Sequence, residues 1–304
     1  MSEKAQVSNK FKDFKPNLTT RPWIVLRMGT RGFAKLFNLD NKIIISLFGL
    51  IYLWTFVFYI LLAGEGEYPC QFITNQDGQS FYDCRPVAYY SDLQFTGVRI
   101  FLVALTAIAS SGLIANDMSD KSIHLYLSRP ISRLDYLIAR FIPIFTLLIL
   151  VTAVPNIMVY ITQWSDAGLK LDWIKENNWL LLNIIIQGIV YSTVFSIIGL
   201  TFSTAINREY RASGAFFLFV YGTNIIVEIF HAIINDDRIL LLSISHLLDI
   251  TNFYIFDKEY HFISFGQLQG LDINDGYAVL TLLVFVACCS IFINWMITNM
   301  EASE

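Results

Sequence analysis

The feature that most constrains the fold of this chain is an apolar run from Ile43 to Ala63 that contains no charged residue. A helix of roughly 20 such residues is long enough to cross the hydrocarbon core of a bilayer. Further apolar stretches of similar length follow at about 97–115, 141–162, 179–206, 213–234 and 278–297. Because these stretches are continuous rather than alternating, they predict transmembrane helices and not the strands of a barrel.

The composition supports the same class of protein. Only 15% of the residues are charged and 55% are hydrophobic, whereas soluble domains contain about 25% charged residues. We therefore predict an all-α polytopic membrane protein with six transmembrane helices. A secreted enzyme, a disordered scaffold and a free nucleic-acid binder are all poorly compatible with this composition.

Successive loops are alternately rich and poor in lysine and arginine, and this alternation predicts the orientation of the chain in the membrane. Fifteen of them fall in residues 1–42, in residues 121–140 and at Arg208 and Arg211, against five in the other loops. The excess of positive charge marks the cytoplasmic side. We expect a cytoplasmic segment 1–41, a transmembrane domain 42–297 and a cytoplasmic tail 298–304 in a prokaryotic plasma membrane. The basic first segment is expected to meet anionic membrane lipid, not nucleic acid.

Residues 21–38 precede the first span and have the pattern of a helix that lies in the membrane interface. Basic residues recur every four positions on one face, and apolar residues cluster on another: Arg27, Arg31 and Lys35, and Trp23, Leu26, Phe33 and Phe37. Two glycines, Gly29 and Gly32, disfavour a helix. An irregular basic linker therefore remains the alternative.

The segment between the fifth and sixth spans is also partly apolar. Ile239–Leu248 and Phe253–Phe256 are too apolar for a solvated loop and too short to cross a membrane. We predict short helices that lie on the outer leaflet or dip into it.

Small residues recur every four positions in the second and fourth spans. They are Ala107, Ser111 and Ala115 in the second span, and Gly188, Ser192 and Ser196 in the fourth. Such spacing lets two membrane helices approach closely. It predicts a packed bundle and does not indicate a substrate.

The cysteines fall into two pairs. Cys70 and Cys84 lie in the same predicted outer loop, which favours a disulfide there, with two unpaired thiols as the alternative. Cys288 and Cys289 are adjacent in the last span and are expected to pack as small apolar side chains. None of the four has the spacing of a metal site.

The fifth span contains a polar stripe of Asn224, Glu228 and His231. Ionisable residues at membrane depth are costly and often functional. Three interpretations stay open: a water-accessible, proton-coupled element, an interhelical hydrogen bond to Arg99 or to an asparagine such as Asn183, and metal ligation by the Glu-x-x-His pair. The remaining histidines are expected at the surface: His124, His246 and His261.

The cytoplasmic loop between the second and third spans is the most informative segment. It contains an acidic turn at Asp117, a short amphipathic piece with Ile123 and Leu127, and the sequence Ser128-Arg-Pro-Ile-Ser-Arg133. Pro130 stops the first piece, and Ser132 can cap the helix that follows. A rigid apolar knob with charged flanks is a plausible docking surface, and a tight turn without any partner is the alternative.

This loop resembles that of the ABC type-2 permeases, the membrane subunits of ATP-driven exporters, including the branch associated with nitrous-oxide-reductase maturation. The residues that carry the resemblance are Asp117, Ser128-Arg-Pro-Ile-Ser-Arg133 and the basic Arg140, although Lys121-Ser122 stands where the family commonly has Gly-Thr. An interfacial helix before six spans is also similar to the family.

The resemblance implies that residues 117–127 form a coupling helix that sits in a cleft of a separate ATPase subunit. The coupling-loop residues that it implicates are Asp117, Lys121, Ile123, Leu127, Arg129, Pro130 and Arg133. The implied partners are cytosolic ABC ATPase subunits, which carry the ATP and Mg²⁺, and a second permease chain, most simply in a homodimer.

The sequence contains none of the motifs G-x-x-x-x-G-K-[ST], G-x-S-x-G and H-E-x-x-H. We therefore expect no catalytic site and no cofactor on this chain. Two other classes of function remain: a proton-coupled secondary carrier that uses Glu228 and His231, and a membrane-embedded metalloenzyme that adds a histidine from an outer loop.

Overall fold

The computed structural model describes residues 21–37, 42–63, 71–74, 80–83, 98–119, 132–166, 168–206, 208–256, 261–263, 266–268 and 275–302. Within these ranges the chain is dominated by long helices, and the predicted all-α polytopic class is confirmed. The long helices are α2 (Arg21–Leu36), α3 (Lys42–Ala63), α5 (Arg99–Ser119), α7 (Arg133–Asp166), α8 (Leu171–Ala205), α9 (Glu209–Ile234) and α11 (Asp275–Ala302).

Four of these helices are long and apolar enough to cross a membrane, counting only the residues that the structure describes. They cover Arg133–Ser165, Asn177–Ala205, Glu209–Ile234 and Gly276–Asn299, and shorter apolar helices cover Lys42–Val57 and Arg99–Ala115. Each predicted span therefore coincides with an apolar helix. Helix α7 extends beyond the predicted span 141–162 at both ends. Helix α8 begins before the predicted span 179–206 and ends at Ala205.

Helix α8 is the centre of the bundle and packs against α5, α7, α9, α10 and α11. Its glycines make this close packing possible: a Cβ atom at Gly199 would lie 2.6 Å from Ser110 Oγ, and one at Gly188 would lie 2.8 Å from Ala153 Cβ. The predicted stripes of small residues on α5 and α8 are buried here, so their role in close packing is confirmed.

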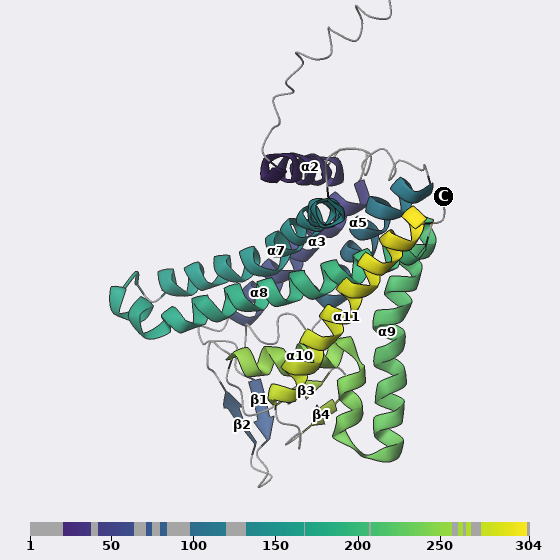
Figure 1. The fold of residues 1–304 in the computed structure, drawn as a ribbon. Coiled ribbons are helices and arrows are strands. Elements are labelled where there is room, and N and C mark those ends of the chain that lie inside the picture. Colours follow the sequence, from purple (N-terminus) through teal and green to yellow (C-terminus); the bar gives the residue numbers. More distant parts are fainter. Residues whose placement is uncertain are drawn as a thin grey trace, which may run out of the picture.

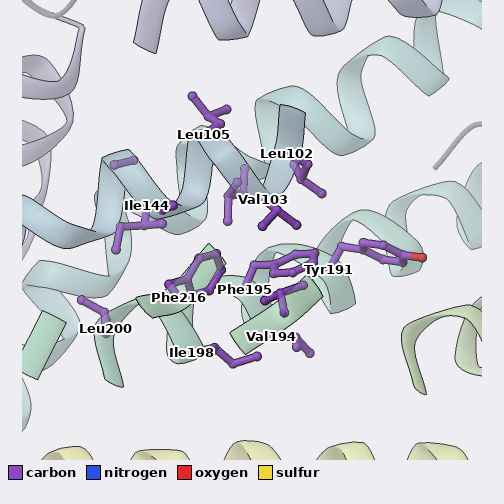
Figure 2. Close-up of a cluster of buried hydrophobic side chains, with 14 of the residues drawn as sticks. Leu102, Val103, Leu105, Ile144, Tyr191, Val194, Phe195, Ile198, Leu200 and Phe216 are labelled. Carbon is purple, nitrogen blue, oxygen red and sulfur yellow. The ribbon is translucent and has the colours of Figure 1, made fainter. Parts of the chain in front are cut away.

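The apolar core lies where α5, α7, α8 and α9 meet. Figure 2 shows side chains from these helices gathered in one cluster, with Val103, Phe195 and Phe216 as examples from three of them. Phe195 and Phe216 pack edge to face, with ring centroids 6.4 Å apart.

The helix predicted over 21–38 is present as α2, although it ends at Leu36, and it packs across α7. The glycines that seemed unfavourable are the contact points: a Cβ at Gly29 would lie 3.0 Å from Ile142 Cγ2, and one at Gly32 would lie 3.1 Å from Pro143 Cγ. Close approach to α7 compensates for the low helix propensity of glycine.

The segment between α9 and α11 contains the predicted short helices: the 3₁₀ helix η2 (Asp237–Leu242) and α10 (Ile244–Phe256). The run from Ser243 to Asn252 is buried, and α10 packs against α8, α9 and α11. Helix α10 is thus enclosed by protein along this stretch instead of lying on a lipid surface. His246 is fully buried, so the prediction of a surface histidine at this position is wrong.

Short strands occur in two antiparallel hairpins that the sequence did not reveal. In the first, β1 (Gln71–Thr74) pairs with β2 (Ser80–Asp83), and in the second, β3 (His261–Ile263) pairs with β4 (Gly266–Leu268). Cys70 and Cys84 lie outside the described residues, so their predicted disulfide stays a prediction. They directly precede and follow a hairpin whose ladder begins with Gln71 opposite Asp83.

The ends of the bundle differ in what they carry. Figure 1 shows α2 and the carboxyl-terminal end of α11 at one end, and α10 with both hairpins at the other. We refer to the first as the Asp117 end and to the second as the Asp249 end, after the residues described next.

Candidate coupling site and buried polar network

Asp117, at the end of α5, is held by two side chains of α7. Tyr136 Oη donates a hydrogen bond of 2.7 Å to Asp117 Oδ2, and Arg140 Nη2 donates to the same oxygen in an ion pair. Tyr136 is buried, and the Arg140 guanidinium lies over its ring, 5.4 Å from the centroid. We call Asp117, Tyr136 and Arg140 the Asp117 clamp. It fastens together the helices on either side of residues 120–131.

The start of α7 is built by a reciprocal cap. Ser132 Oγ accepts a hydrogen bond from the backbone N–H of Asp135 at 3.2 Å, and the Asp135 carboxylate accepts one from the N–H of Ser132 at 3.0 Å. This is the capping-box arrangement, and it confirms Ser132 as the capping residue. Next to it, Arg133 Nη1 donates to Thr298 Oγ1 of α11 at 3.0 Å.

Ser203 of α8 inserts into α5 just before the clamp. Its Oγ donates to the carbonyl of Ser111 at 3.0 Å and accepts from the N–H of Ala115 at 3.1 Å. The Ser111 carbonyl and the Ala115 N–H are four residues apart and are a hydrogen-bonding pair in a regular α-helix. Helix α5 is therefore tied to α8 directly before Asp117.

The sequence prediction for the coupling loop is only partly covered by the structure. Asp117 and Arg133 are described, and both hold neighbouring helices as set out above. The other predicted coupling residues lie outside the described residues: Lys121, Ile123, Leu127, Arg129 and Pro130. Tyr136 is not among the residues predicted from the sequence, although it binds Asp117. Its spacing of four residues from Arg140, on one face of a helix, was the signal.

The opposite end of α5 carries a buried ion pair. Arg99 Nη1 donates to Asp249 Oδ2 of α10 at 3.1 Å, and Arg99 Nη2 donates to Asp249 Oδ1. Both side chains are buried. Gln187 Nε2 of α8 donates to Asn252 Oδ1 at 2.7 Å, and Asn183 Nδ2 donates to the carbonyl of Ile255 at 2.7 Å. Polar contacts thus hold α10 to α5 and α8.

The predicted polar stripe of α9 faces η2 and α10. Asn224 Nδ2 donates to Glu228 Oε1 at 3.0 Å, and Ser243 Oγ donates to Asn224 Oδ1 at 3.4 Å. His231 Nε2 lies 2.9 Å from Asp237 Oδ1. The prediction that this stripe binds Arg99 or Asn183 is wrong. Arg99 binds Asp249, and Asn183 donates to the carbonyl of Ile255. Asp249 could not be singled out, because nothing local in the sequence links α5 to α10.

His246 lies beside this stripe, with Nε2 3.6 Å from Glu228 Oε1. Within the described part of the chain, neither ring nitrogen has a hydrogen-bond partner. Burial lowers the pKa of His246 to about 4, with further lowering from the positive charge of Arg99 and from the nearby His231. His246 is therefore neutral near pH 7.

The described residues offer no group of three or more histidine, cysteine, aspartate and glutamate side chains suited to a metal ion. Glu228 and His231 take part in hydrogen bonds to Asn224 and Asp237 instead. The geometry thus gives the stripe a hydrogen-bonding role between helices.

The fold defines an all-helical multi-pass membrane protein whose polar groups tie helices to one another. A comparison with protein families identifies the family to which the chain belongs. The sequence model described as ABC-2 family transporter protein matches residues 8–296, nearly the whole chain. The chain belongs to the ABC-2 transporter family and is a membrane permease of an ABC transporter. No curated protein matches the chain significantly.

Proposed function

We propose that this chain is the permease subunit of an ATP-driven exporter and that residues 117–133 couple it to separate cytosolic ATPase subunits. ATP and Mg²⁺ bind those partners, and two permease chains form the translocation unit. The observation that carries the proposal is the Asp117 clamp, because it joins the two helices that flank the loop.

The clamp supplies a route for the movement. When the ATPase subunits close, they displace the loop, and the clamp makes α5 and α7 move together. The Ser203 contact carries the movement from α5 to α8, and the Arg133 contact carries it from α7 to α11. The central position of α8 then spreads it through the bundle.

The orientation of the bundle supports a cytosolic loop. Arg27 and Arg31 on α2, Arg133 and Arg140 on α7, and the turn with Arg208 and Arg211 belong to the Asp117 end. By the positive-inside rule this end faces the cytosol, together with both termini.

The test uses the chain co-purified with its ABC ATPase and reconstituted in proteoliposomes. We expect Asp117→Arg and Arg140→Asp each to reduce the stimulation of ATPase activity at least about tenfold, because each places like charges in the clamp. The double exchange Asp117→Arg with Arg140→Asp restores the opposite charges and recovers much of the stimulation.

The matched control is Lys175→Gln, which removes an exposed surface ion pair with Asp172 on α8. It leaves stimulation unchanged, since such pairs contribute little. Unaltered stimulation in both single clamp variants, with the complex intact, would contradict the coupling proposal. Failure of any ABC ATPase to co-purify would contradict the proposal that ATPase subunits bind this chain.

The second permease chain is proposed from the exposed faces of α9 and α11. Large apolar side chains cover both helices, among them Leu218 and Ile225 on α9 and Leu283 and Ile291 on α11. These faces meet either lipid or another chain in the membrane. Single-molecule mass measurement in nanodiscs distinguishes a dimer from a chain of 34.8 kDa.

A further inference from the structure

Helix α2 is locked in one rotation about its axis. Gly29, Gly32 and Leu36 are buried on the side that packs against the bundle. The close contacts of Gly29 with Ile142 and of Gly32 with Pro143 leave no room for a turn of the helix about its axis. The remaining faces of α2 therefore point in fixed directions.

The exposed side of α2 has two adjacent sectors, as follows from 3.6 residues per turn. One sector is apolar: Trp23 is 57% exposed and Leu26 is 49% exposed. The other sector is a basic row of Arg27, Arg31 and Lys35, spaced four residues apart and all exposed. The helix contains no acidic residue that would offset this charge.

We infer that this exposed side of α2 is a binding surface for anionic phospholipid. Trp23 and Leu26 lie at the boundary of the acyl chains, where an indole ring is favoured. Arg27 and Arg31 contact the phosphates of the headgroups, to which guanidinium groups donate paired hydrogen bonds. A zwitterionic lipid satisfies the apolar sector equally well but gains less from the basic row.

The surface lies next to the coupling site. Helix α2 contacts Ile142 and Pro143, and Arg140 of the Asp117 clamp lies two residues before Ile142 in the same helix α7. Lipid held on the exposed side of α2 is therefore linked to α7 through α2 itself. The binding itself depends only on α2 and stands independently of the proposed coupling.

The test measures binding of fluorescent phosphatidylglycerol and phosphatidylcholine to the full chain in detergent micelles. The wild type binds phosphatidylglycerol more tightly. In 0.5 M NaCl the screening length is roughly twofold shorter than in physiological salt, which reduces the difference between the two lipids. Arg27→Gln with Arg31→Gln weakens phosphatidylglycerol binding about tenfold and weakens phosphatidylcholine binding much less, so most of the preference is lost.

Three further arms separate the surface from other causes. Arg27→Lys with Arg31→Lys keeps the charge and retains most of the preference. Lys170→Gln with Lys175→Gln removes two exposed charges elsewhere and retains all of it. Inorganic phosphate in millimolar excess does not displace the lipid, because it lacks the acyl chains that the apolar sector holds.

The inference is overturned if the wild type binds the two lipids equally, or if the double glutamine variant keeps its preference for phosphatidylglycerol. Displacement by inorganic phosphate would show a free-phosphate site and would equally overturn a lipid surface. If the glutamine variant fails to fold, the single Arg31→Gln change is measured instead, with about a threefold expected loss.

Discussion

Two ion pairs at opposite ends of α5 hold its neighbours in different ways. Asp117 and Arg140 are 23 residues apart and flank one loop, and their side chains remain 16% and 14% exposed. Arg99 and Asp249 are 150 residues apart, and their side chains are 7% and 1% exposed. The first pair joins the two helices that flank one loop, whereas the second fixes the α10 segment to the membrane helices.

The comparison predicts the largest loss of stability at the Asp249 end. Asp249→Leu removes the carboxylate that Arg99 binds while the Arg99 charge stays buried, which costs about 3–5 kcal/mol. The double change Arg99→Met with Asp249→Leu removes both charges and recovers most of that loss. Chemical unfolding of the purified protein in micelles measures both. If the double variant is as unstable as the single one, the pair acts through packing and not through charge.

His246, at the Asp249 end, is expected to make the stability of the protein depend on pH. Its pKa is about 4 in the folded protein against an ordinary 6.5, so protonation favours the unfolded chain. The stability that His246 contributes is complete above pH 6.5 and is lost as the pH falls toward 4, by about 3 kcal/mol at most. Glu228, 3.6 Å away, attracts a charged imidazole and reduces this loss.

The measurement is the unfolding free energy from pH 7.5 to 4.5 for the wild type and for His246→Gln. The variant has a shallower decline because it does not bind the extra proton. Parallel curves would show that the acid sensitivity comes from other groups and that burial of His246 has no consequence for pH.

More of the residues at the Asp117 end than at the Asp249 end could be predicted from the sequence, for a physical reason. Asp117, Ser132 and Arg140 belong to one short segment, so their spacing and capping chemistry were visible without tertiary information. Arg99 was seen at the edge of its span, but its partner comes from another part of the chain. Long-range pairing leaves no local pattern, since many carboxylates are possible partners.

The same limit explains the errors elsewhere. Helix periodicity in the sequence predicted the apolar helices and α2. The low helix propensity of Gly29 argued against α2, because propensity carries no information on the contact between Gly29 and Ile142. His246 looked like a surface residue because the sequence does not show which neighbours enclose α10. The family match and the fold agree with the prediction, whereas the coupling residues at 121–130 lie outside the described residues.

The middle of α5 tests whether the two ends are joined by a rigid helix contact. Gly199→Ala places a Cβ within 2.7 Å of Ser110 Cβ, so the helices must separate, and we expect a loss of about 1–3 kcal/mol. Gly214→Ala on α9 is the matched control, because nothing lies within 4 Å of its added Cβ. The control is neutral or slightly stabilising by about 1 kcal/mol at most. Equal unfolding midpoints for the two variants would refute close α5–α8 packing.

The smallest effect on stability is expected from Asp117→Asn, which removes the charge of the clamp but keeps an oxygen that accepts from Tyr136. Because Asp117 and Arg140 are both partly exposed, the loss is about 1 kcal/mol, and high salt reduces it. Unfolding in micelles at two salt concentrations measures it beside Asp249→Asn, the matched change at the buried pair. If the two asparagine variants lose equal stability, the Asp117 clamp is as fixed as the pair of Arg99 and Asp249. A clamp of that kind would resist movement of α5 and α7 and would weaken its proposed role in coupling.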